Sequence, residues 1–196
     1  MQKLTFKKIW GHLRTVHTHR KWVRHYCFLA GIPWRGLVHD LSKYSPVEFF
    51  ESARYWDGKS SPINRAKEEQ GISYGWLHHK GRNKHHYEYW MDNFDKGGVA
   101  RLMPCKDFTE MVCDMLGASV AYTGNKDHRA CQRCFDYWKD HKKRGCALNL
   151  QNQQMLDIIF ADLAHAERLS PETVTPEKLL KTGYIQMVWK ANCHDD

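Results

Sequence analysis

The sequence lacks the features that mark several classes of protein. It contains no run of about 18 apolar residues, the minimum for a membrane-spanning helix. Its basic N-terminus has no apolar segment of the kind that secretory signals carry. Runs of alternating β-branched residues and Asn-Gly hairpin turns, which are typical of strands, are also missing. We therefore expect a soluble, cytoplasmic, all-α protein with no membrane partner.

Acidic residues are fewer than basic ones. Asp and Glu number 22 against 30 Lys and Arg, which gives a formal net charge of +8. This excess favours an anionic partner, and we expect a small phosphorylated substrate or nucleotide, with nucleic acid as the alternative. The seven cysteines are scattered along a chain without an export signal, so we expect reduced thiols. The oligomeric state stays open.

The length of 196 residues suits one domain, and the chain has no internal repeat or Gly/Ser-rich linker. Apolar residues at helical spacing, with Gly and Pro stops, predict a succession of helices. We expect a helical core over residues 1–125 and a C-terminal helical extension over residues 126–196, packed on the same domain. The predicted helices cover residues 4–30, 33–41, 45–58, 107–122, 128–144 and 149–168, with a further helix starting at Ser61-Pro62 and a short helical tail around Pro171 and Pro176.

Histidine is unusually abundant, with 13 residues in the chain. Closely spaced imidazoles are unfavourable to pack unless their nitrogens find partners, and a transition metal supplies one. The alternative is a solvated basic loop that binds phosphate without metal. Under either interpretation Arg82, Asn83 and Lys84 would contact an anionic substrate. The densest cluster consists of His78, His79, His85 and His86.

His39 and Asp40 form an adjacent pair on the predicted second helix. The side chains of neighbouring helical residues point in directions about 100° apart around the helix axis. The pair can therefore coordinate one or two metal ions, and the aspartate can bridge two ions. Lys43 lies four residues after His39, on the same helical face, where it could neutralise a phosphate oxygen. A His-Asp pair also arises often by chance, so its meaning depends on the other candidate ligands.

Helical phase separates the histidines of the first predicted helix. His19 points toward the apolar stripe of Val16 and Val23, His12 leans the same way, and His25 lies opposite. We therefore expect His19 to be the metal ligand from this helix. The alternative for His19 or His12 is a core histidine that is hydrogen bonded to a carbonyl.

Asp114 lies on the inward face of the helix predicted over residues 107–122, beside Met111 and Ala118. A carboxylate is seldom buried without a partner, and a metal ion or a basic side chain would serve. Gly117, next to Ala118, would let another helix or a substrate approach closely.

These residues together resemble a known family. His19, His39-Asp40, the later histidine pairs and Asp114 follow the ligand order of the HD-domain superfamily. The run His-Asp-Leu-Ser-Lys that begins at His39 is similar to the His-Asp-x-Gly-Lys motif of branches that hydrolyse cyclic dinucleotides, although Ser42 replaces the glycine. No Gly-Tyr-Pro motif follows the paired histidines. With Ser45-Pro46-x-Glu48-Phe49 and the spacing of the histidine pairs included, the pattern resembles more closely a small bacterial and phage family known only as a domain of unknown function. The resemblance covers roughly residues 15–123.

The resemblance implies an HD-domain-like helical bundle with additional C-terminal helices. It implies one or two divalent transition-metal ions, of manganese, iron, nickel, cobalt or zinc. The core ligands would be His19, His39, Asp40 and Asp114. A second ion would be coordinated by some of the four later histidines: His78, His79, His85 and His86.

Members of the superfamily are mostly metal-dependent phosphohydrolases, and a minority are di-iron oxygenases. The resemblance therefore implies hydrolysis of a nucleotide or other small phosphoester; a di-iron oxygenase and a basic nucleic-acid-binding protein are the alternatives. In a hydrolase, Lys43 and Arg82 would neutralise charge on the phosphoryl oxygens. Glu48 would either orient a histidine or, as we expect, form a capping box with Ser45.

Cys131-x-x-Cys134, with Cys146 and His128 or His141 nearby, has some features of a zinc site. A structural zinc site normally needs a second well-spaced pair, which is missing. We therefore expect these cysteines to pack on a helix face.

Overall fold

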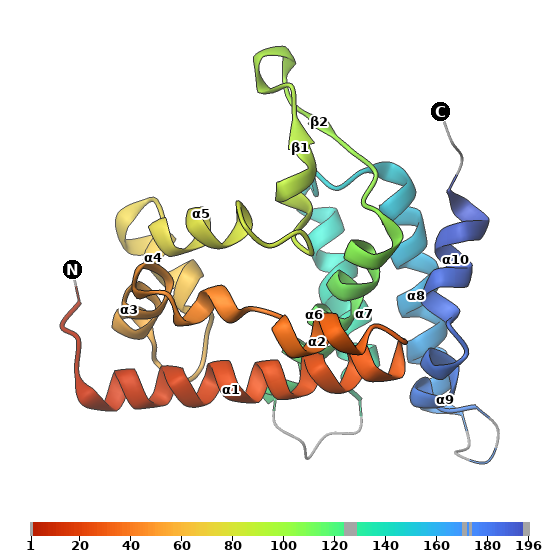
Figure 1. Ribbon diagram of the computed structural model, residues 1–196, viewed down its shortest axis with the longest axis horizontal. Coiled ribbons are helices and arrows are strands. Elements are labelled where there is room, and N and C mark those ends of the chain that lie inside the picture. Colours follow the sequence, from red (N-terminus) through yellow and green to blue (C-terminus); the bar gives the residue numbers. More distant parts are fainter. Residues whose placement is uncertain (1, 124–128, 170–171, 173, 194–196) are drawn as a thin grey trace.

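A computed structural model describes residues 2–123, 129–169, 172 and 174–193 of the chain. It confirms the all-α class: the described residues form ten α-helices and only one pair of two-residue strands (Figure 1). No helix in this part of the chain is long and apolar enough to cross a membrane. The helices are α1 (Phe6–Leu29), α2 (Pro33–Val38), α3 (Pro46–Tyr55), α4 (Pro62–Gln70), α5 (Tyr74–Lys80), α6 (Cys105–Thr123), α7 (Ala130–Lys143), α8 (Leu150–Arg168), α9 (Pro176–Lys181) and α10 (Tyr184–Asn192).

The two strands form a small hairpin between α5 and α6. β1 (Met91–Asp92) pairs antiparallel with β2 (Val99–Ala100), and Asn93 and two following glycines adopt positive φ angles in the connection. The sequence pattern predicts no strand here, because two-residue strands are too short to show alternation. Three short 3₁₀ helices, η1 (Leu41–Tyr44), η2 (Tyr87–Trp90) and η3 (Phe94–Lys96), lie in the connections around α2 and the hairpin.

The long helices α1 and α6 pack closely at the centre of the molecule. A Cβ atom added to Gly117 on α6 would lie 2.5 Å from Cγ2 and 2.8 Å from the backbone nitrogen of Val23 on α1. The absence of a side chain therefore sets the separation of these helices, as the sequence predicted for Gly117. One continuous apolar core joins both helices to α7, α8 and α10 through Leu116, Trp138, Phe160 and Ile185.

Two predicted helices have different boundaries in the structure. The helix expected over residues 33–41 ends at Val38, because His39 is extended (ψ 130°) and Asp40 is left-handed (φ 55°). The helix expected from Ser61 toward Trp76 is two helices, since Gly71 (φ 75°) ends α4 and Ser73 caps α5. In both places a residue with positive φ interrupts an apolar pattern that periodicity alone reads as continuous.

The cysteines of α7 pack in the core, as expected. Cys131 and Cys134 are buried in the apolar core, and burial raises the pKa of both thiols. His128, one of the residues weighed for a zinc site here, lies outside the described residues. Within the described chain, no group with metal-binding geometry includes Cys131, Cys134, Cys146 or His141. All seven cysteines are free thiols.

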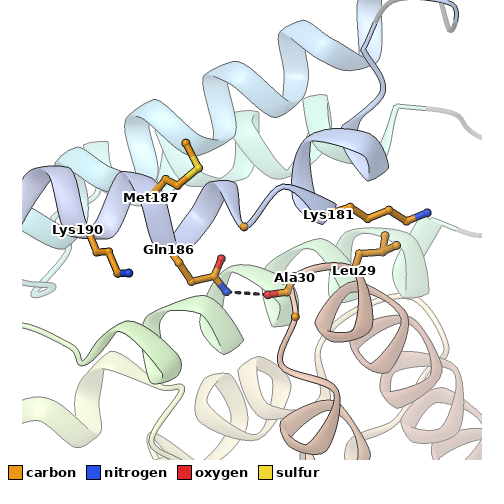
Figure 2. Close-up of a pocket in the computed structure, with 8 residues that line it drawn as sticks. Leu29, Ala30, Lys181, Gln186, Met187 and Lys190 are labelled. Carbon is orange, nitrogen blue, oxygen red and sulfur yellow. Dashed lines mark hydrogen bonds between the residues drawn. The ribbon is translucent and has the colours of Figure 1, made fainter.

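A cavity of about 390 Å³ lies between the C-terminal end of α1 and α10. Figure 2 shows its polar contact, in which Gln186 Nε2 donates to the carbonyl oxygen of Ala30 at 2.7 Å. The charged groups on its wall are Lys181 and Lys190, and neither histidine nor carboxylate lines it. It therefore offers no metal site.

Candidate metal centre

Five segments bring a cluster of imidazoles and carboxylates together in the interior. α1 supplies His19, and the turn after α2 supplies His39 and Asp40. All three are less than 10% exposed, and Asp40 is 1% exposed. The remaining members come from α5, from the loop after α5 and from α6: His79, His85, His86 and Asp114.

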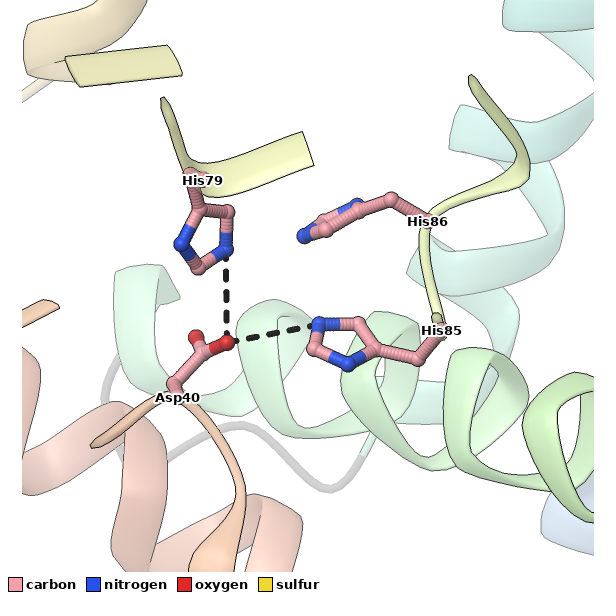
Figure 3. Close-up of side chains that lie close together, drawn as sticks. All are labelled: Asp40, His79, His85 and His86. Atoms are coloured by element: carbon pink, nitrogen blue, oxygen red, sulfur yellow. Dashed lines mark ion pairs between the residues drawn. The ribbon is translucent and has the colours of Figure 1, made fainter. Parts of the chain in front are cut away.

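Asp40 is the centre of this cluster. Its Oδ2 atom lies 3.4 Å from His19 Nε2 and 3.3 Å from His39 Nε2. Its Oδ1 atom faces the other way, at 3.3 Å from the Nε2 atoms of both His79 and His85 (Figure 3). The left-handed backbone at Asp40 turns the chain immediately after His39, which lets both adjacent side chains point inward. The prediction that this pair projects from a helix was wrong, although the two residues do converge.

Asp40 divides the cluster into two groups of potential ligands that share its carboxylate. In the first group, His19 Nε2 lies 3.0 Å from Asp114 Oδ1 and 3.4 Å from His39 Nε2. The ligand atoms in each group all lie within 4.8 Å of one another. The first group contains His19, His39, Asp40 and Asp114, and the second contains Asp40, His79, His85 and His86.

The spacing of these atoms fits transition-metal coordination. A cation about 2.1 Å from each ligand atom places adjacent ligands about 3.0 Å apart in octahedral and about 3.4 Å apart in tetrahedral geometry. Most of the separations around Asp40 are 3.0–3.4 Å. The Nε2 atoms of His79, His85 and His86 are buried and have no hydrogen-bond partner among the described residues. A metal ion would satisfy these nitrogens, so the residues present fit the implied cofactor.

Carboxylates hold the opposite ring nitrogen of three of these histidines. Glu110 Oε1 lies 2.9 Å from His39 Nδ1 and 3.2 Å from His85 Nδ1. Glu48 Oε2 lies 2.7 Å from His79 Nδ1. With the proton on Nδ1, each imidazole turns its Nε2 lone pair toward Asp40, which is the usual arrangement of carboxylate–histidine–metal sites.

Glu110 is a functional residue that sequence reasoning missed. It lies one helical turn before Asp114 on α6, so its position on the inward face was readable from the helical period. Arg35 Nη1 binds its other oxygen at 2.7 Å and Asp107 at 2.6 Å. Burial raises the pKa of Glu110, but hydrogen bonds from His39 and His85 outweigh it and bring the pKa to about 2.

The electrostatics of the cluster favour bound positive charge. Burial raises the pKa of Asp40, yet His39, Lys43 and His79 lower it well below its usual range. Burial lowers the pKa of His39, but Asp40, Asp114 and Glu110 raise it well above the ordinary value. His86 differs, because burial and its neighbours His85 and His79 depress its pKa and keep the ring neutral, the form that binds metal.

Glu48 does not form the expected capping box. The side chain of Ser45 makes no capping hydrogen bond at the start of α3. Glu48 instead accepts hydrogen bonds from His79, from His78 Nδ1 at 2.6 Å and from Ser42 Oγ at 3.1 Å. The alternative weighed for Glu48, that it orients a histidine, is the arrangement found in the structure.

The structure leaves His78 outside both ligand groups. Its Nδ1 is bound to Glu48, and its Nε2 accepts a hydrogen bond from Arg82 Nε at 2.8 Å. Both ring nitrogens are therefore occupied by protein groups. Because His78 and His79 are consecutive on α5, only one of them can face Asp40.

The predicted anion contacts after α5 do not line the cavity beside the cluster. Arg82 is exposed and bound to His78, and Asn83 donates to Ser42 Oγ at 2.9 Å and to the His79 carbonyl at 2.8 Å. Lys84 lies over the ring of Tyr89, at 5.8 Å from its centroid. These residues shape the turn between the histidine pairs, so their expected role in binding substrate is not supported by their positions.

A cavity of about 750 Å³ opens beside the candidate metal centre. Members of both ligand groups line it, together with Lys43, whose Nζ lies 2.6 Å from Asp40 Oδ2. Further cationic side chains on its wall are Lys59, Lys67 and Arg133. The cavity therefore offers an anionic molecule direct access to the candidate metal ions.

The helical phase predicted for α1 is confirmed. His19 and His12 are buried, whereas His25 is exposed. His19 belongs to a ligand group and His12 does not, although His12 lines the cavity.

Comparison of the sequence with known proteins identifies one family, whose function is unknown. No curated protein and no solved structure matches the chain. The HD-domain resemblance therefore receives no support from these comparisons. The family of unknown function DUF5662 matches residues 8–163, a stretch that contains every residue of the candidate metal centre. The match covers most of the chain, and the protein belongs to this family.

Proposed function

We propose that this protein is a metal-dependent phosphohydrolase that acts on a small phosphoester. One observation carries the proposal: the two oxygens of Asp40 face two separate His/carboxylate groups at the wall of an accessible cavity. Two-metal centres built in this way commonly catalyse phosphoester hydrolysis. The cationic side chains on the cavity wall and the net charge of +8 agree with an anionic substrate.

His19, His39, Asp40 and Asp114 would hold one ion, and Asp40, His79, His85 and His86 the other. When bound, the ions would lower the pKa of a coordinated water and polarise a phosphoryl oxygen. Glu48 and Glu110 would keep His79, His39 and His85 in the orientation that ligation needs, through the contacts to their Nδ1 atoms.

Lys43 would bind and neutralise the phosphoryl group. Its ammonium group lies at the cavity wall, 2.6 Å from an oxygen of the shared ligand Asp40. A charged lysine cannot ligate a cation, so it contributes positive charge beside the metal ions rather than a ligand. Charge placed where a transition state becomes more anionic accelerates phosphoryl transfer.

The experiment that tests the proposal measures both the metal content of the protein and its hydrolysis of phosphoesters. Protein purified without a chelator or a histidine tag would be analysed for bound metals and then assayed with p-nitrophenyl phosphate and a panel of phosphorylated metabolites. Manganese, iron, cobalt, nickel and zinc would each be supplied to the metal-depleted protein. We expect hydrolysis that depends on one or more of these metals and disappears when Asp40 is replaced by asparagine.

Two results would contradict the proposal. Absence of hydrolysis with every metal and substrate would remove its chemical basis. Two equivalents of iron combined with substrate-dependent oxygen uptake would assign the centre to a di-iron oxygenase instead.

A further inference from the structure

The cavity contains a buried histidine that the proposed hydrolysis does not use. His12 is 5% exposed, lines the cavity and packs against Phe49 with ring centroids 5.2 Å apart. Its Nδ1 atom is buried and has no hydrogen-bond partner among the described residues. A buried ring nitrogen without a hydrogen-bond partner destabilises the fold. A polar group of a molecule bound in the cavity could provide that hydrogen bond.

His12 lies at a defined distance from the metal centre. It precedes the ligand His19 by seven residues, two turns of α1, so the two share a face about 10 Å apart along the helix axis. The charge of Lys43 acts on His12 in addition to burial, and together they lower its pKa to about 4. His12 is therefore neutral, with one donor and one acceptor nitrogen, and it suits an uncharged polar group.

Two hydroxyl-bearing residues line the cavity on the helices that flank His12. Thr15 follows it by one turn on α1, and Ser52 comes from α3, the helix that also supplies Phe49. The cavity wall formed by α6 and α7 carries the apolar side chains of Met111 and Trp138 together with the charged Asp114 and Arg133. The Thr15 hydroxyl already donates to the Gly11 carbonyl oxygen and accepts from Trp56 Nε1. The α1/α3 end of the cavity therefore offers a ligand the His12 imidazole and the Ser52 hydroxyl.

Building on the proposed function, we propose that His12 binds a hydroxyl group of the substrate, and that the substrate is a phosphorylated sugar or polyol. The phosphoryl group lies at the metal centre beside Lys43, and the hydroxyl-bearing chain extends along α1 to His12. The axial rise of about 10 Å from His19 to His12 requires a substrate long enough to reach both the candidate metal centre and His12. The volume of about 750 Å³ accommodates such a molecule.

Binding of two matched phosphonates tests this site. The methylene phosphonate analogue of ribose 5-phosphate carries hydroxyl groups, and hexylphosphonate has the same number of carbon atoms without them. Calorimetry on the full-length, manganese-loaded protein should show about tenfold or tighter binding of the hydroxylated probe, the effect of one good hydrogen bond.

His12→Phe removes both ring nitrogens and keeps the aromatic volume. The preference for the hydroxylated probe should fall close to one, while the affinity for hexylphosphonate stays within about twofold. His12→Gln should restore part of the preference, because its amide both donates and accepts. His25→Phe is the matched control, since it makes the same substitution at an exposed position of α1 and should leave the preference unchanged.

Three results would overturn the His12 site: equal affinity of the normal protein for both probes, no binding of either probe, or an unchanged preference in folded His12→Phe. If His12→Phe does not fold, His12→Leu provides the apolar variant for the same comparison. Calorimetry needs no turnover, so a His12-dependent preference without hydrolysis contradicts only the proposed reaction. Hydrolysis without a preference contradicts only the His12 site.

Discussion

At the scale of single residues, Asp40 must adopt a left-handed backbone conformation and must also present both carboxylate oxygens to potential ligand groups. Its φ of 55° lies in the left-handed region, which aspartate and asparagine tolerate better than most residues. Its two oxygens must also serve two ligand groups. These requirements can be separated by mutation, because asparagine meets the first and lacks the charge needed for the second.

We predict that Asp40→Asn folds normally and loses bound metal from both groups. The amide keeps the shape and backbone preference of aspartate, but its nitrogen cannot ligate a cation and its single oxygen is uncharged. Elemental analysis would measure the metal content, and circular dichroism would measure folding. An Asp40→Asn protein that keeps its full metal complement would show that Asp40 does not bridge.

Lys43 and Arg82 differ in their relation to the cavity. The Lys43 ammonium group lies at the cavity wall beside Asp40, whereas the Arg82 guanidinium is bound to His78 away from it. We predict that Lys43→Met leaves metal content intact and lowers kcat/KM for a phosphoester by about 10²-fold, as loss of an aimed charge usually does. Arg82→Met should lower it by less than about fivefold. Metal loss in Lys43→Met, or equal effects of both substitutions, would refute this distinction.

At the scale of elements, helical periodicity predicted which face of a helix is buried, but it did not predict where helices are interrupted by turns. It placed His19 inward and His25 outward on α1, because both questions concern one regular helix. It missed the left-handed turn at Asp40 and the break at Gly71, because an apolar pattern carries no information about local φ angles. It also could not choose between His78 and His79, which depends on how α5 meets α3.

The contact of α1 with α6 gives a prediction at this scale. Gly117→Ala should destabilise the protein by about 1–3 kcal/mol, since the added methyl group would meet the Val23 backbone as well as its side chain. At a free helical position the same change is stabilising by about 1 kcal/mol, so the sign of the effect reports the packing. Chemical denaturation would measure it, and a stabilised Gly117→Ala protein would show that the helices can separate without strain.

At the scale of the whole molecule, the candidate metal centre brings together segments that are far apart in the sequence. Its ligands come from α1, from the turn after α2, from α5 and its following loop, and from α6. The main apolar core is formed by α1, α6, α7, α8 and α10. α2 and α3 pack directly on α1, where Gly36 meets Cys27 and Gly11 meets Trp56. α5 packs on α3, and α5 and its following loop contribute His79, His85 and His86 to the polar cluster that joins them to α1 and α6.

We therefore predict that removal of metal loosens α5 and its following loop before it affects the core. At a metal concentration of 100 times the dissociation constant, binding stabilises the folded state by about 2.7 kcal/mol. For a chain of this length that corresponds to a Tm lower by about 5–10 °C after chelation. Hydrogen exchange should rise in α5 and in the loop that carries His85 and His86, while α8 remains protected. Thermal unfolding and exchange that are the same with and without metal, in protein shown to bind it, would mean that the cluster is held together without the ions.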